Sequence, residues 1–452
     1  MTRGPVRAVL SCLAMLACPG GAALAQQPVP PPVRPLGPIT HVAAESLASV
    51  ATAVPVSGGR VYVNDITGRR LLLFDPDLAR ATVVADSAGS AEAYGTAPGT
   101  LLPYRGDSAL FISPSALSML VLTREGAVAR VMATPPSGRG PGLMGLIGSI
   151  FGTPGFDARG RLAYFLPVNL IIERSPATGQ MRLEPPDSAL VVRFDFASRT
   201  LDTAAAIRIP RTRSVLTRNE SGRPIGITMT ALPPATVDDW AVTSDGTIAI
   251  VRGRDYHVDW LAPEGTWSST PRMAFSWERL DDDQKNSLLD SMVATLQVQM
   301  DSNLAQQERV LAGASSGQRS APASRAGGGV TMAVVTTRGE AAPGAGDGAT
   351  VTRTTSAPRP TVARAELSDV PDYRPPFGQG AVRADAEGRL WIRTSKMLDG
   401  RPVYDIVSRQ GVVVDRLQLP PNRTIAGFGP GVVYMGVRDS LGATHLERAR
   451  IR

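Results

Sequence analysis

Short apolar runs bounded by turn residues recur along most of the chain. In the first copy of this pattern the runs occupy 59–65, 68–75 and 81–85, and each is rich in Val, Leu or Tyr and flanked by Gly, Asp or Arg. Apolar runs of this length, flanked by such turn residues, are typical of strands in an antiparallel sheet. The pattern therefore predicts strands joined by tight turns rather than helices.

The unit of apolar runs occurs six times along the sequence. Its copies open near Gly59, Ser108, Asp157, Ser244, Asp385 and Gly431. Once insertions are allowed for, the spacing is roughly 45 to 60 residues, which is the range of propeller blades. A sandwich does not need self-similar units, and the linkers are too short and too rich in Gly and Pro for the helices of a parallel α/β fold.

A phrase of the form (D)-x-x-G-R/T-L/I-W/A-I/V, followed by V-x-x-F/W-D/L-x-x-G, runs through the copies, for example at Asp385–Ile392. It resembles the six-bladed β-propellers of the NHL and TolB-like kind, of the secreted bacterial type, over residues 45–452 apart from one interruption. Copies two and six depart from it. The resemblance implies an all-β fold, a β-propeller of six blades to within one. It does not specify a function, because propellers host unrelated activities.

The two ends of the chain are expected to meet. In such a ring an N-terminal strand usually completes the last blade, and Thr40–Ala44 is the segment predicted to do so. Closure of this kind leaves no exposed sheet edge.

One long interruption separates copies four and five. Residues 280–311 predict a helix: Asp281–Asp283 supplies the N-cap and an acidic first turn, and Leu288, Met292 and Leu296 recur every four residues. Residues 312–365 are rich in Gly, Ala, Ser and Thr and poor in large apolar side chains, which predicts disorder. Blades one to four are therefore assigned to 39–279 and blades five and six to 366–452.

The N-terminal segment predicts export. Arg3 and Arg7 precede a short apolar stretch, and Ala23–Ala25 supplies a small-x-small cleavage pattern, so residues 1–25 are interpreted as a signal peptide. A lipid anchor at Cys18 is the alternative processing. Residues 26–38 are Pro-rich and predict an extended tether. The expected location is periplasmic or secreted.

Composition narrows the possible partners. The chain has 47 Lys+Arg and 40 Asp+Glu, a net charge of +7 over 452 residues, with 5% aromatic residues. This charge is too dilute, and the aromatics too few, to indicate nucleic-acid binding. After the signal peptide there is no apolar stretch long enough for a transmembrane helix.

The densest polar stretch holds the candidate site residues: Arg252, Arg254, Asp255 and His257. They fall where a hairpin between two strands of copy four should turn. One interpretation is structural, with Arg254 and Asp255 paired across the hairpin. In the other, Arg252, Arg254 and His257 bind an anion or a carboxylate at the rim of the propeller.

Other familiar motifs are missing or incomplete. The glycine-rich run 138–152 lacks the Gly-Lys-Ser/Thr ending of a phosphate loop, and the sequence has no Gly-x-Ser-x-Gly and no His-Glu-x-x-His. No metal ligands and no cofactor are predicted for the chain.

Two functional hypotheses follow. The first, which we favour, is a non-enzymatic recognition scaffold that binds a peptide, a glycan or a partner protein through its central funnel or rim loops. The alternative is a metal-assisted hydrolase, lactonase or lyase, with a divalent cation held by carboxylates and amides in the central channel.

Overall fold

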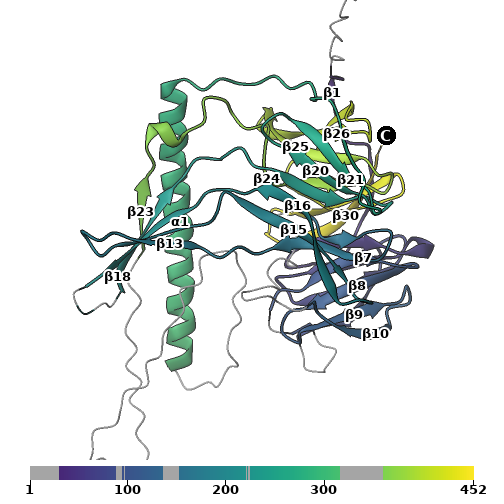
Figure 1. Cartoon of the computed structure of the whole chain (residues 1–452). Coiled ribbons are helices and arrows are strands. Elements are labelled where there is room, and N and C mark those ends of the chain that lie inside the picture. The colour runs from purple at the N-terminus through teal and green to yellow at the C-terminus, as the bar shows by residue number, and fades with distance from the viewer. Residues whose placement is uncertain are drawn as a thin grey trace, which may run out of the picture.

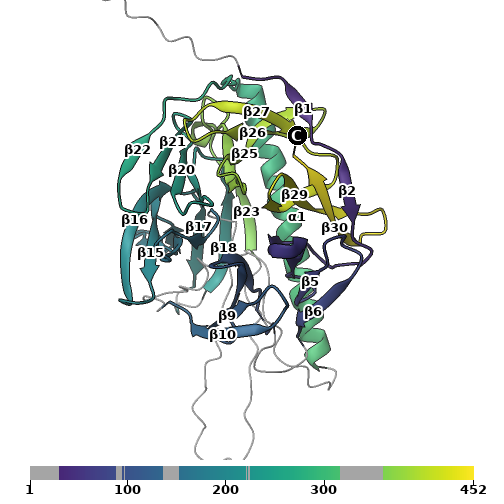
Figure 2. The same ribbon diagram turned by 90° about the vertical axis from the view of Figure 1, so that its right-hand side faces the viewer.

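Six sheets stand around a common axis in the computed structural model of the chain. It describes residues 30–87, 94–95, 97–135, 152–219, 221, 224–315 and 360–451. Figure 2 looks along the axis, with the sheets arranged as the blades of a ring. The predicted signal peptide, both cysteines and most of the glycine-rich run 138–152 lie outside the described residues. The fold is a six-bladed β-propeller, as the sequence predicted.

The first three blades follow the chain from the innermost strand outward. Blade one is β3 (Thr52–Pro55), β4 (Val61–Asp65), β5 (Arg70–Phe74) and β6 (Ala81–Ala85). Blade two is β7 (Thr100–Tyr104), β8 (Ser108–Ser113), β9 (Ser118–Leu122) and β10 (Val128–Ala133). Blade three is β11 (Gly155–Phe156), β12 (Leu162–Leu166), β15 (Ser188–Asp195) and β16 (Thr200–Arg208).

The last three blades complete the ring. Blade four is β19 (Asp239–Val242), β20 (Ile248–Arg252), β21 (His257–Leu261) and β22 (Trp267–Ser269). Blade five is β24 (Phe377–Ala384), β25 (Leu390–Leu398), β26 (Arg401–Val407) and β27 (Val413–Gln418). Blade six is β28 (Arg423–Gly429), β29 (Val432–Arg438), β30 (Thr444–Arg450) and the N-terminal β2 (Ile39–Val42).

Blade strands are apolar on both faces because each blade is packed between two others. In β4, Val61 and Val63 join the core shared with blade six, whereas Tyr62 joins the core shared with blade two. All three are fully buried. This is why the sequence shows continuous apolar runs instead of the alternation of a sheet with one solvated face.

The N-terminal segment closes the ring. β2 pairs antiparallel with β30, which confirms the closing strand predicted at Thr40–Ala44. The proline-rich segment before it is not simply a tether. β1 (Val33–Pro35) pairs parallel with β27, Arg34 forms an ion pair with Asp415, and Leu36 is 7% exposed in the core between blades five and six. Prolines are compatible with this edge position because an outer strand needs few backbone donors.

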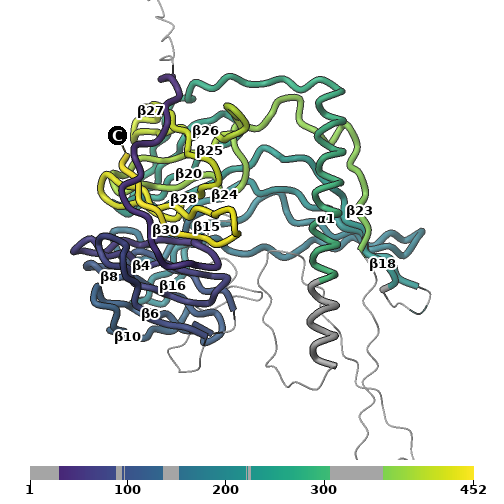
Figure 3. Tube along the Cα trace, turned by 180° about the vertical axis from the view of Figure 1, so that it is seen from behind, coloured from purple at the N-terminus to yellow at the C-terminus, as the bar shows by residue number. Residues whose placement is uncertain are grey.

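The ring carries an inserted sheet that the sequence did not reveal. Its strands, in spatial order, are β13 (Ile171–Arg174), β14 (Met181–Glu184), β17 (Arg213–Arg218), β18 (Pro224–Ala231) and β23 (Pro360–Arg364). They come from three excursions: within blade three, between blades three and four, and between blades four and five. Figures 1 and 3 show the inserted sheet and its helix to one side of the ring.

Helix α1 (Asp282–Ser315) packs against this inserted sheet. The Asp281 carboxylate accepts a hydrogen bond from the backbone N–H of Gln284, as the predicted N-cap requires. Leu289 lies in a small core with Ala365 and Val370. The predicted disordered segment 312–365 is therefore too long at both ends. Helix α1 extends to Ser315, residues 360–364 form β23, and Ala365 contributes to this core. Residues 316–359 lie outside the described chain.

Innermost strands line the central channel and touch their neighbours around most of the ring. Contacts join β28 to β3, β3 to β7, β7 to β11, β11 to β19 and β19 to β24. Between β24 and β28 the described strands make fewer contacts than the other neighbouring innermost strands do. Behind them, blades five and six still share a core that contains Trp391 and Ile425.

Candidate functional site

The four residues singled out in the sequence lie around the turn between β20 and β21. Arg252 is held in place by two carboxylates: its Nε lies 2.7 Å from Asp259 and its Nη1 lies 2.9 Å from Asp238. His257 Nε2 lies 3.3 Å from the same Asp259. These contacts tie the hairpin to its own blade, as the structural interpretation expects.

The predicted pairing of Arg254 with Asp255 is wrong. Asp255 forms its ion pair with Arg272, at 3.1 Å, and Arg254 is exposed and has no partner among the residues that the structure describes. Tyr256, which follows them in the turn, has a positive φ of 48°, and its side chain is fully buried. None of the four candidate side chains lines either of the pockets described below.

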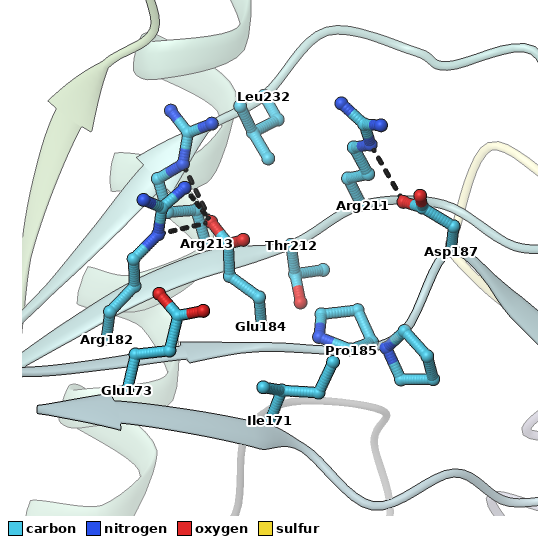
Figure 4. Close-up of a pocket in the computed structure, with 11 residues that line it drawn as sticks. Ile171, Glu173, Arg182, Glu184, Pro185, Asp187, Arg211, Thr212, Arg213 and Leu232 are labelled. Carbon is cyan, nitrogen blue, oxygen red and sulfur yellow. Dashed lines mark hydrogen bonds and ion pairs between the residues drawn. The ribbon is translucent and has the colours of Figure 1, made fainter.

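One pocket lies where the inserted sheet leaves the ring (Figure 4). It has a volume of about 320 Å³, and each of its arginines is paired with a carboxylate, whereas Glu173 has no ion pair among the described residues. Glu184 accepts hydrogen bonds from Arg182 at 2.8 Å and from Arg213 at 2.9 Å, and Arg211 lies 3.2 Å from Asp187. With its guanidinium groups already neutralised, this pocket is best explained as the polar junction of the inserted sheet.

A second pocket, of about 390 Å³, lies between blades five and six, which we call the channel opening. Strands from both blades line it: β24, β25 and β26 of blade five and β28 of blade six. Its lining residues are Gln379, Gly380, Ala381, Arg383, Trp391, Arg393, Tyr404, Thr424 and Ile425. It occupies the place where the innermost strands of the ring separate.

A bulge in β24 creates the channel opening. Phe377 pairs with Thr394 and Val382 pairs with Ile392, so five positions of β24 span the distance covered by two of β25. Gly380, inside the bulge, has a φ of +67°, a conformation that glycine adopts without strain. Bulges re-aim side chains and end strand pairing locally. Here the bulge draws the strand away from its ladder beside Arg393.

The charged side chains of the channel opening are both cationic. Arg383 and Arg393 have no ion pair or hydrogen bond within the described ranges of the chain. Burial lowers the pKa of Arg383 below its usual range, and the neighbouring charge of Arg393 acts in the same direction. Tyr404 is 8% exposed, and burial raises the pKa of its phenol. The opening therefore holds two guanidinium groups that have no ion-pair partner among the described residues, together with a neutral hydroxyl donor.

Asp239 holds β24 on the side of blade four. It is 1% exposed, and its carboxylate accepts hydrogen bonds from the backbone N–H groups of Val382 at 2.8 Å and Trp240 at 2.9 Å. A backbone hydrogen bond from Ala381 adds to these. This attachment fixes the end of the bulge toward blade four and leaves the side toward blade six open.

Asp239 should make the stability of the ring depend on pH. Burial raises the pKa of its carboxyl to about 7, against the opposing effect of the backbone N–H donors. A carboxyl whose pKa is higher in the folded than in the unfolded chain contributes stability at low pH, which is lost as the pH rises through the folded value. Between about pH 6 and pH 8 this loss should be about 1.4 kcal/mol of unfolding free energy.

The measurement is urea unfolding at both pH values for the wild type and for Asp239→Asn, which cannot titrate. The wild type should lose more stability between them than the variant does. Parallel pH profiles for the two proteins would show that Asp239 does not titrate in this range.

Across the described ranges, no three or more His, Cys, Asp or Glu side chains converge as a metal site would require. In the same part of the chain, none of the helices has the length and apolar character needed to cross a bilayer.

Comparisons with known proteins bear on the fold. No family model matches the chain, and no curated protein matches its sequence. Among solved structures, virginiamycin B lyase from Staphylococcus aureus is 9% identical, with 92% of this chain and 99% of that chain covered and a TM-score of 0.34. The calcium-binding protein regucalcin from Agrobacterium tumefaciens is 10% identical, with 93% and 98% covered and a TM-score of 0.34.

A luciferin-regenerating enzyme is likewise 10% identical, with 90% and 92% of the two chains covered and a TM-score of 0.34. At this level of similarity, what these proteins bind or catalyse carries no argument about the present chain. The propeller is established by its own six sheets.

The sequence contained a signal for the channel opening that composition alone does not bring out. Phe377–Ala381 reads Phe-Gly-Gln-Gly-Ala directly before an apolar strand. Two glycines so close to a strand indicate a bulge or a close approach of the backbone. The position of Arg393 opposite that bulge follows only from the strand register.

Proposed function

We propose that the protein is an exported recognition scaffold that binds its ligand in the channel opening between blades five and six. The observation that carries this proposal is the pocket between β24 and β28, where the described innermost strands make the fewest contacts around the ring. Pockets of this size that expose a few unpaired polar groups are the usual binding sites of rigid folds. The N-terminal segment 1–25 would direct the protein out of the cytoplasm.

The ligand classes that suit such an opening are a peptide, a glycan or a segment of a partner protein. Its walls are largely rigid, because Trp391 is fully buried and donates a hydrogen bond to Asp385 at 3.0 Å. A rigid site loses little conformational entropy on binding. The scaffold would therefore bind without large rearrangement of the ring.

The proposal is tested by screening the purified protein on peptide and glycan arrays beside the variant Gln379→Trp. Gln379 is half-buried in the bulge and lines the pocket, so an indole there should fill the opening without disturbing the packed core. Ligands of the wild type should be lost in this variant while its thermal unfolding stays unchanged. Ligands that bind both proteins equally would place recognition elsewhere on the ring.

A further inference from the structure

The arginines of the channel opening differ from the arginines that join strands within the blades. Arg252, Arg416 and Arg423 each lie within 3.0 Å of a carboxylate oxygen. Arg383 and Arg393 have no such partner in the part of the chain that the structure describes. Arg383 is half-buried, and a cation partly withdrawn from water without an ion-pair partner destabilises the fold, so a ligand outside the folded chain would account for its retention.

No carboxylate forms an ion pair with these arginines among the described residues. Asp239 offsets part of the charge of Arg383 from a distance, but its oxygens accept the backbone N–H groups of Val382 and Trp240. The remaining polar groups of the pocket add donors. The hydroxyls of Tyr404 and Thr424 and the amide of Gln379 line it, and none of the three has a hydrogen-bond partner among the described residues.

We propose that the channel opening is an oxyanion site, in which the guanidinium groups of Arg383 and Arg393 hold a carboxylate or phosphate group of a small ligand. This inference rests on the proposed function and specifies the chemistry of the ligand. Two guanidinium groups match the geometry of an oxyanion through paired hydrogen bonds. Arg393, which is exposed, would meet the anion at the mouth of the pocket, and Arg383, which is half-buried, would hold it farther inside.

The direct test measures binding of succinate and of inorganic phosphate by calorimetry and by the shift in thermal midpoint. Succinamide, the uncharged analogue of succinate, serves as the control ligand. Succinate or phosphate should raise the midpoint, and the stronger of the two identifies the kind of oxyanion preferred. A shift no larger than that given by succinamide, or by chloride at the same ionic strength, would overturn the proposal.

The variants Arg383→Gln and Arg393→Gln should each weaken anion binding by about 10- to 100-fold, the loss of one charge-assisted contact. Arg254→Gln is the matched control, since Arg254 is also unpaired within the described residues but lies outside the pocket. Added salt should reduce the contribution of exposed Arg393 more than that of Arg383. Equal affinity in all three variants would contradict the assignment.

A second readout separates a binding role from a structural one. Without anion, Arg383→Met should raise the thermal midpoint by about 2 °C or more, because it removes a half-buried cation that has no ion-pair partner among the described residues. A midpoint that falls instead would show that Arg383 supports the fold, and the proposal would fail. If array ligands no longer bind Gln379→Trp but still bind Arg393→Gln, the proposed binding function stands and the proposal of an anionic ligand is refuted.

Discussion

Replacing Asp405 by alanine is expected to lower the free energy of unfolding by about 3 to 5 kcal/mol, the cost of removing one partner from a buried ion pair. Asp405 is 2% exposed in blade five. Its carboxylate accepts hydrogen bonds from the Arg416 Nε at 3.0 Å and from the Tyr256 hydroxyl of blade four at 2.8 Å. The substitution would leave a cation and a phenol unpartnered between two blades.

Urea unfolding measures this loss, and Tyr256→Phe is the matched control. That variant removes only the hydroxyl and leaves the ion pair between Asp405 and Arg416 in place. It should therefore lower the free energy of unfolding by about 1 to 3 kcal/mol. Burial and the neighbouring carboxylate raise the pKa of Tyr256 well above its usual value, so its hydroxyl remains a donor at all ordinary pH values. Equal losses in the two variants would show that the ion pair contributes nothing beyond the hydroxyl bond.

Deleting residues 30–43 from the mature protein should lower the free energy of unfolding by still more, about 4 to 8 kcal/mol. The deletion removes the strands β1 and β2 and the buried side chain of Leu36, which alone is worth about 2 to 5 kcal/mol. It also leaves β30 as an unpaired edge, which favours association with other chains.

This prediction is checked by urea unfolding together with size-exclusion chromatography. Leu36→Ala is the control, because it removes the side chain while both N-terminal strands can still pair. The truncated protein should unfold at a much lower urea concentration than this control and should associate. A truncated protein that stays monomeric and as stable as the wild type would mean that the ring does not depend on its closing strand.

The blades could be predicted from the sequence because each is built from consecutive residues. A strand such as Val61–Asp65 is apolar throughout, ends at turn residues and pairs with the next strand along the chain. Local composition is therefore enough to place it. The closing strand was also predictable, since a ring of blades leaves one edge free and the N-terminal segment offered a matching apolar run.

The inserted sheet could not be predicted in the same way. Strand β23 pairs in parallel with β18, and Thr361 lies beside Thr228 although 133 residues separate them. The inserted strands mix polar and apolar residues, as β14 does with Met181, Arg182, Leu183 and Glu184, so the sequence shows no long continuous apolar run. The excursions find one another only after the ring has brought their ends together.

The sequence by itself determined the class of fold, the order and number of the blades, the ring closure and the capped helix, because these depend on neighbouring residues. Only the tertiary structure decided which charges remain unpaired. Asp239 reaches across 143 residues to the backbone of Val382 and holds β24 toward blade four. Beside that strand, Arg383 and Arg393 have no ion-pair partner among the described residues, whereas Arg252, one of the arginines that the sequence singled out, is paired with Asp238 and Asp259. Pairing of charges depends on distances in space, and the strand register and blade packing fix these distances.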